Sequence, residues 1–209
     1  MRRTALLILC AFLASALYAQ SSSGWKLKKS SDGVEVYYRQ VENSPINEIK
    51  ITTSFYGTLQ SLLDIMRDVN SYPRWVYKCL SSELVDRSSP SEAYYYAVMD
   101  FPWPLSDRDF VAGSKIYSGA NGKVVITVKG APDKVPVHKE RVRVPVLDYR
   151  WEFIPSGNNN IQVKYYLRSD PGGELPAWLI NLVIDQGPTQ TVKNLRELLQ
   201  KNNALGKGL

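Results

Sequence analysis

Few residue types in this sequence are suited to covalent or metal chemistry. The chain of 209 residues contains one histidine, His138, and two cysteines, Cys10 and Cys79. With a single imidazole and no cluster of cysteines, these residues cannot assemble a standard zinc site. No GxSxG motif frames a serine as a nucleophile, and the sequence has no GxGxxG motif or phosphate-binding loop. We therefore expect no metal, no nucleotide and no other cofactor.

The stretch FPWPLSDRDFVAG combines an apolar half that holds two prolines with an acid, an arginine and a second acid. Proline cannot continue a strand, so Trp103 and Leu105 should be presented on a stiff loop. Strand alternation then sends the side chains of Arg108 and Asp109 to opposite faces. A buried arginine needs a partner, so an inward Arg108 would meet either Asp100 or the polar group of a bound molecule.

These residues are positioned by strands, because apolar and polar residues alternate with a period of two along most of the chain. Turns rich in glycine and asparagine separate the alternating runs. We expect about seven to nine half-buried antiparallel strands. The clearest runs cover residues 49–55, 124–128, 142–146, 149–153 and 161–167.

Two segments follow a helical period instead. Thr58 can cap a helix whose apolar stripe ends before Pro73. Residues 176–200 carry a longer apolar stripe, which Gly187 and Pro188 should kink near its middle, because proline removes a backbone hydrogen bond. The pattern predicts an α+β fold, in which a curved antiparallel sheet wraps around a long C-terminal helix.

The N-terminus is typical of an export signal. Two arginines precede an apolar run that is shorter than the roughly 20 residues of a membrane span, and small residues suited to cleavage follow. We expect export to the periplasm or secretion. Once the signal is removed, Cys79 has no cysteine left to pair with. The chain then divides into a signal peptide, a polar spacer, one domain and a flexible tail, at residues 1–19, 20–24, 25–202 and 203–209.

Charge and aromatic content narrow the function. The net charge of +6 falls to +4 without Arg2 and Arg3, and the basic residues are dispersed. This charge is too weak to indicate a nucleic-acid partner, so we expect none, and it permits transient contact with a membrane. The chain has five tryptophans and thirteen tyrosines, and one helix can cover only part of a long concave face. An empty apolar cavity costs about 24 cal/mol per Å³, so a bound apolar molecule would relieve that cost.

Four stretches resemble the START lipid-transfer family in order and spacing, within the wider helix-grip group. They are YPRWVYKC, FPWPLSDRDFVAG, DYRWEFIP and GGELPAWLINLVIDQGPTQTVKNLRELL. The resemblance covers about residues 25–200 and implies a helix-grip fold around an internal hydrophobic cavity. It also implies a lid, made here of the loop 101–107 and the helix 176–200.

The resemblance and the aromatic positions together predict the residues that contact a ligand. We expect no catalytic residue among them, and we expect the protein to be a monomer. The predicted ligand-binding residues are Trp75, Tyr96, Trp103, Leu105, Arg108, Trp151, Trp178, Leu179, Leu182, Val183 and Gln186.

The leading hypothesis is a non-enzymatic carrier that binds and transfers a lipid or another hydrophobic small molecule. A sterol, a phospholipid, a fatty acid and a hopanoid all remain possible cargoes. A helix-grip enzyme, such as a cyclase or hydratase acting on a hydrophobic ring, is the alternative; a paired acid and base in the interior would favour it. A wide, permanently open groove would favour a secreted module that holds a protein helix. The acids and bases available to an enzyme are Asp100, Asp148, Glu152, Tyr96 and His138.

Overall fold

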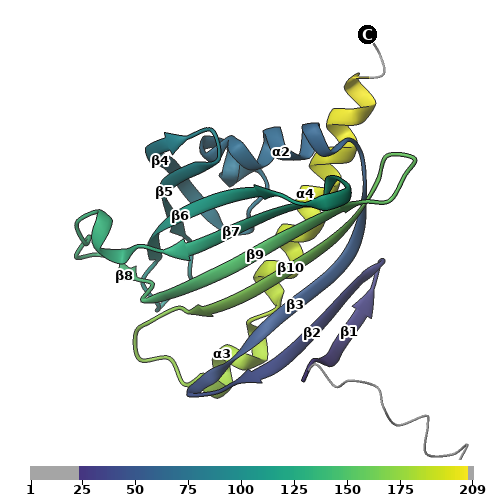
Figure 1. The fold of residues 1–209 in the computed structure, drawn as a ribbon. Coiled ribbons are helices and arrows are strands. Elements are labelled where there is room, and N and C mark those ends of the chain that lie inside the picture. The colour runs from purple at the N-terminus through teal and green to yellow at the C-terminus, as the bar shows by residue number, and fades with distance from the viewer. Residues whose placement is uncertain (1–23, 207–209) are drawn as a thin grey trace, which may run out of the picture.

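The computed structural model describes residues 24–206, and within this range one ten-stranded sheet curves around the C-terminal helices (Figure 1). The strand order is β1-β2-β3-β10-β9-β7-β6-β5-β4, and β8 pairs with β6. The strands are β1 (Lys26–Ser31), β2 (Val34–Val41), β3 (Ser44–Tyr56), β4 (Cys79–Ser89), β5 (Glu92–Met99), β6 (Arg108–Ser118), β7 (Val124–Gly130), β8 (Val142–Arg143), β9 (Val146–Pro155) and β10 (Asn160–Asp170). The helices are α2 (Leu59–Arg67), α3 (Ala177–Val183) and α4 (Gln186–Gly206), with short 3-10 turns η2 (Val69–Arg74), η3 (Ala120–Gly122) and η4 (Pro132–Lys134).

The strands form where alternation gives the sheet one apolar face. Ile49, Ile51 and Phe55 of β3 all face the core and are at most 1% exposed. Trp151 and Phe153 of β9 also face the core and are 2% and 0% exposed. Neighbouring strands pair antiparallel, so these side chains form continuous rows across the concave face. The predicted curved antiparallel sheet is confirmed.

One predicted strand is wrong. Alternation suggested a single strand over residues 142–146, but β8 has only two residues, which pair in parallel with the start of β6. Pro145 then separates β8 from β9, because proline has no N–H to donate to a ladder.

The first helix begins as predicted. The hydroxyl of Thr58 accepts a hydrogen bond from the backbone N–H of Ser61 at 3.1 Å, which satisfies one of the free donors at the start of α2. Leu62 and Met66 bury the apolar stripe against the core.

The C-terminal segment differs from the expected single kinked helix. It is divided into α3 and α4 by a break at Ile184 and Asp185, just before the glycine and proline thought to cause a kink. Pro188 lies in the first turn of α4, where its missing N–H has no partner inside the helix. Proline therefore helps to start a second helix. This helix continues to Gly206, three residues past the expected start of a flexible tail at residue 203.

The core lies between α4 and the concave face of the sheet. Val192, Leu195 and Leu199 form the inward stripe of α4 and are fully buried. None of the helices within residues 24–206 combines the length and the apolar composition that a membrane span requires. The predicted signal peptide lies outside the described residues.

Candidate functional site

The interior between the sheet and the C-terminal helices is closed at one end and more accessible at the other. Along β9, the inward residues Phe153 and Trp151 are 0% and 2% exposed, whereas Tyr149 and Leu147 are only partly buried. On the neighbouring part of the sheet, Phe110 is also only partly buried. We call this more accessible end the mouth.

Hollows of about 500 and 300 Å³ lie outside this interior. The larger one is on the outer face of the sheet beside Trp25 and Tyr166, and the smaller one lies between β1 and α4. An enclosed tunnel of lipid size therefore stays a prediction.

Aromatic rings line much of the interior. Tyr95 packs edge-on against Phe110, with 5.9 Å between the ring centroids. The ring centroids of Trp151 and Tyr165 are 4.2 Å apart. The hydroxyls of Tyr95 and Tyr149 are hydrogen-bonded to each other. Burial raises the pKa of both phenols well above the ordinary value for tyrosine, so they stay neutral. The interior thus offers hydroxyl groups on an apolar surface.

Besides Nε of Arg67, two buried side-chain polar atoms in the described residues have no hydrogen-bonding partner. They are the indole Nε1 of Trp75 and the hydroxyl of Thr189, in residues that are 3% and 7% exposed. Leaving a buried donor unpaired costs roughly 1–3 kcal/mol. A bound molecule with an oxygen acceptor could satisfy the N–H of Trp75, which was predicted as a ligand contact.

Arg108 faces inward at the mouth, since it lies opposite Met99 and on the same face as Phe110. It is 3% exposed, and its guanidinium lies 4.1 Å from the centroid of the Phe101 ring. Burial lowers the pKa of this guanidinium. Of the two partners considered for an inward Arg108, the carboxylate of Asp100 is ruled out. Asp100 pairs instead with Lys78, at 2.8 Å.

The guanidinium of Arg108 donates to backbone carbonyls from two different loops. One acceptor is Ser106, in the loop before β6. The others are Pro171 and Gly172, both 3.4 Å away, in the segment between β10 and α3. Arg108 therefore links the two segments that frame the mouth.

Asp109 occupies the opposite face of β6. It is fully buried and accepts hydrogen bonds from the Arg143 guanidinium at 2.6 Å and the Tyr96 hydroxyl at 2.8 Å. Arg141 donates to the same hydroxyl. Tyr96, predicted as a ligand contact, therefore lies on the outer side of the sheet, in a small cluster with Val98 and Val111.

The predicted lid residues mostly point to solvent. Trp103 is 92% exposed, Trp178 is 70% exposed and Leu182 is 62% exposed. Val183 is also exposed. These four side chains form an exposed apolar set at the surface rather than a lining of the interior.

The remaining predicted residues are distributed between the core and the surface. Trp151 is buried in the core, Leu105 and Leu179 are partly buried, and Gln186 lies at the surface beside the smaller hollow. The buried residue of α3 is Ile180.

The sequence interpretation missed several inward aromatic residues. Strand alternation from Trp151 and Val163 gave the signal for two of them, and the run Tyr94-Tyr95-Tyr96 concealed which residue of β5 points inward. The missed residues are Tyr95, Phe110, Tyr149 and Tyr165.

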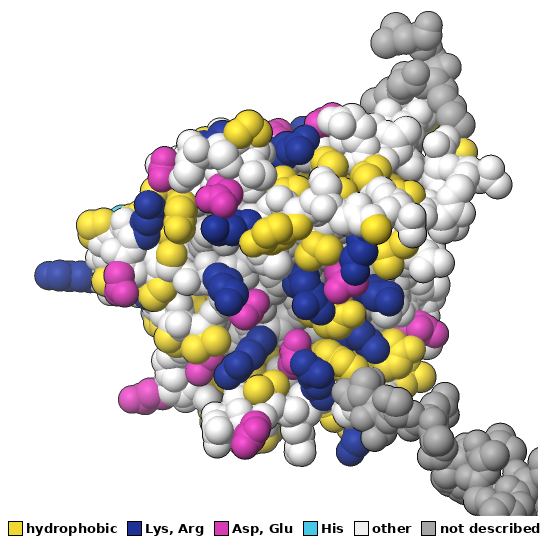
Figure 2. Space-filling view, in the orientation of Figure 1, with side chains coloured by type: hydrophobic (Ala, Val, Ile, Leu, Met, Phe, Trp, Pro, Cys, Tyr) yellow, Lys and Arg dark blue, Asp and Glu magenta, His cyan; other side chains and the backbone are white. Residues whose placement is uncertain are grey.

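The candidate acids and bases of an enzyme lie outside the interior. Glu152 pairs with Lys123 on the outer face, and Asp148 lines the larger hollow there. Figure 2 shows basic, acidic and hydrophobic side chains intermingled over this face. His138 is exposed, with its ring 5.8 Å from that of Tyr96. No acid and base meet in the interior among the residues described.

Two buried carboxyl groups should set the acid limit of stability. Burial alone would raise the pKa of Asp109 and Asp185, but hydrogen bonds from Arg143 and from Lys28 and Lys29 outweigh it and lower both values. The unfolded chain then binds more protons near pH 4, so this stabilisation is present above about pH 4 and is lost as pH falls through the lower folded values.

We therefore expect the thermal unfolding midpoint to be flat from about pH 8 to 5 and to fall below about pH 4, as measured by circular dichroism. Asp109→Asn should make the acid decline shallower. A steep decline between about pH 7 and 5 would contradict this assignment.

The sequence is similar to a known domain family and to known proteins. The sequence model of the START domain matches residues 10–204. An uncharacterized protein from Pseudomonas aeruginosa is 30% identical over 193 residues, which cover 90% of this chain and 95% of that protein. The phosphatidylcholine transfer protein of Rattus norvegicus is 24% identical over 187 residues, covering 87% of this chain and 86% of the relative.

The fold also matches a solved structure of a bacterial protein. The STAR-related lipid transfer protein of Xanthomonas axonopodis superposes with a TM-score of 0.80 at 31% sequence identity. The match covers 85% of this chain and 99% of that structure.

Proposed function

The chain belongs to the START domain family, and from this premise we propose that it is a non-enzymatic carrier that shelters a lipid between the concave face of the sheet and α4. The observation that carries the proposal is the composition of the inward face. Aromatic and aliphatic side chains line it, neutral phenols supply its hydrogen-bonding groups, and the acids and bases available for catalysis lie elsewhere. This arrangement suits binding rather than turnover.

The energetics of lipid transport require such a shelter. Each methylene moved from water into an apolar site contributes about 0.8 kcal/mol, so a chain of about sixteen carbons gains roughly 13 kcal/mol. The lipid would enter at the mouth, with its polar end near Arg108 and the indole N–H of Trp75. The loop 101–107 and α3 would form the lid that opens at a membrane.

The same proposal assigns a cellular setting. We take the N-terminal segment as a signal for export, so the carrier works in the periplasm or after secretion, as a monomer. Its partners are lipid cargo and, transiently, the membrane surface. The phosphatidylcholine transfer protein among its relatives makes a phospholipid one candidate cargo.

Protein purified from cells should carry extractable lipid, in a ratio near one molecule per chain, as measured by native mass spectrometry and lipid extraction. Trp75→Phe keeps an aromatic ring, although a smaller one, and removes the unpaired N–H, so it should weaken lipid retention about fivefold or more, given the cost of a lost hydrogen bond. Trp25→Phe, beside the hollow on the outer face, is the matched control. An empty protein that ignores every added lipid would refute the proposal.

A further inference from the structure

A β-bulge in the edge strand β1 directs two adjacent lysines to one carboxylate. In the pairing of β1 with β2, Leu27 lies opposite Tyr37 and Lys29 lies opposite Val36, so Lys28 is an additional residue without a partner position. In a regular strand, neighbouring side chains point to opposite faces. A bulge re-aims them. Both ammonium groups consequently reach the same acceptor.

That acceptor is Asp185, at the break between α3 and α4. The two carboxylate oxygens lie 2.6 Å from Lys28 Nζ and 2.7 Å from Lys29 Nζ, and the residue is only 3% exposed. Lys28 Nζ also lies 3.2 Å from the backbone carbonyls of Asn181 and Leu182, in the last turn of α3. One lysine therefore holds both the end of α3 and the break that follows it.

Further along α4, an ion pair and a hydrogen bond connect the helix to the turn of the β1–β2 hairpin. Lys193 Nζ lies 2.6 Å from the carboxylate of Asp32 in the hairpin turn. Arg196 donates to the backbone carbonyl of the same residue at 2.9 Å. We call Lys28, Lys29, Asp185, Lys193 and Asp32 the charged seam.

The hollow of about 300 Å³ lies on this seam and has a cationic lining. It contains Lys29 and Lys193 but no acidic residue. The other lining residues are neutral: Tyr77, Gln186, Thr189 and Gln190. An anionic group such as a phosphate complements this charge.

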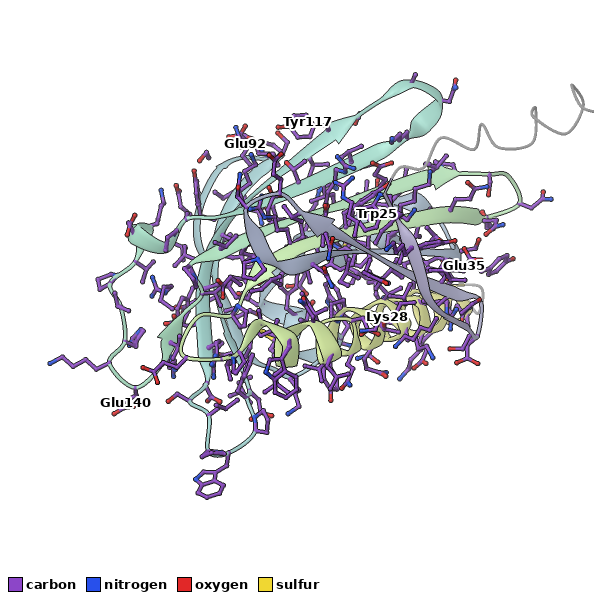
Figure 3. All side chains as sticks on the ribbon, turned by 90° about the horizontal axis from the view of Figure 1, so that it is seen from below. Trp25, Lys28, Glu35, Glu92, Tyr117 and Glu140 are labelled. Atoms are coloured by element: carbon purple, nitrogen blue, oxygen red, sulfur yellow. The ribbon has the colours of Figure 1, made fainter. Side chains whose placement is uncertain are left out.

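Exposed apolar side chains adjoin the seam. Leu182, whose carbonyl contacts Lys28, has a side chain that is 62% exposed, and Trp178 and Val183 of the same helix are exposed too. Figure 3 places Lys28 beside the C-terminal helices, shown in yellow. Basic groups next to exposed apolar side chains are the combination that binds an anionic bilayer.

We infer that the charged seam is a docking site for the phosphate groups of an anionic bilayer, and that docking releases α3. Phosphates compete with Asp185 for Lys28 and Lys29, which are 29% and 40% exposed at the side chain. Once the lysines turn to the membrane, they no longer hold the end of α3. The inference deepens the proposed carrier function and rests on it, because α3 is part of the proposed lid.

The test compares lipid release to vesicles of phosphatidylcholine with and without phosphatidylglycerol. We expect phosphatidylglycerol to accelerate release by the unaltered protein about tenfold. Lys28→Gln with Lys29→Gln should weaken binding to anionic vesicles roughly thirtyfold and abolish the acceleration. Asp185→Asn should raise release to neutral vesicles toward the anionic rate, because the lysines then hold α3 less firmly.

Three controls isolate the seam. Lys115→Gln removes the ion pair between Lys115 and Glu92. Figure 3 shows Glu92 far from Lys28, so this variant should behave like the unaltered protein. Lys28→Arg with Lys29→Arg should preserve the response. The double glutamine variant leaves the buried carboxylate of Asp185 without a partner, and this could unfold the protein. In that case Asp185→Asn is added to remove the charge, and the same release assay is carried out on the triple variant.

Two results of the release assay would overturn the docking site. Retained acceleration in the folded glutamine variant would overturn it, and so would equal acceleration of release to neutral vesicles by millimolar inorganic phosphate. Binding of unloaded protein to vesicles is measured in parallel. Failure to load any lipid, with anionic vesicle binding intact, would refute the carrier function but not the docking site.

Discussion

The double variant Trp103→Ala with Trp178→Ala should release lipid to vesicles at least about tenfold more slowly than the unaltered protein, while its thermal stability stays unchanged. The two indoles are 92% and 70% exposed, so they contribute little to the core. Burying a large apolar side chain in a membrane contributes about 1.5–3 kcal/mol, and about 1.4 kcal/mol corresponds to tenfold. Losing both anchors therefore weakens membrane contact strongly.

Tyr117→Ala is the matched control for this prediction. Tyr117 is an aromatic residue of β6 that is 51% exposed and lies away from α3, as Figure 3 shows. Its removal should leave the release rate unchanged. Normal release by the double tryptophan variant would mean that neither the loop 101–107 nor α3 contacts the membrane through these rings.

The variant Trp151→Ala should lower the free energy of unfolding by about 3–5 kcal/mol. Trp151 is 2% exposed and packs between Phe153, whose ring centroid is 5.7 Å away, and Tyr165, at 4.2 Å. Deleting the indole removes apolar contacts and leaves a cavity that a rigid sheet cannot fill.

Urea unfolding followed by circular dichroism measures this loss. Trp103→Ala makes the same chemical change at an exposed site and should alter the free energy of unfolding by about 0.5 kcal/mol at most. A loss below about 1 kcal/mol for Trp151→Ala would show that the interior collapses around the missing ring.

Strands β3, β7 and β10 were predictable because each of them buries a single face. Residues 49–55 and 161–167 alternate strictly, and alternation alone places Phe55 and Val163 in the core. On β5 three consecutive tyrosines satisfy either orientation, so the sequence does not show that Tyr95 points inward and Tyr96 outward.

Helix α3 was harder to interpret for a similar reason. Trp178, Ile180 and Leu182 make it apolar on more than one side, and only the packing against the sheet selects Ile180 for burial. A hydrophobic stripe identifies the inward side of a helix only when the opposite side is polar. The sequence therefore predicts that Trp178, Leu182 and Val183 line the interior, although their side chains are exposed.

The contacts of Asp185 depend on distant parts of the chain. Lys28 is 157 positions away, and the bulge that aims it leaves no mark in the alternation of β1. Arg108 illustrates the same limit. Its neighbours allowed a carboxylate partner, but the fold supplies backbone carbonyls from two loops.

The shared grip of Arg108 on these loops has a consequence for the fidelity of transport. Because one guanidinium serves the carbonyls of Ser106, Pro171 and Gly172, displacing either loop alone would leave polar groups unpaired at the mouth. Moving one loop alone therefore already costs the free energy of the hydrogen bonds that it makes with Arg108. If the chain is the carrier proposed above, cargo would then leave in rare, all-or-none events, and the loaded protein would leak little while it diffuses between membranes.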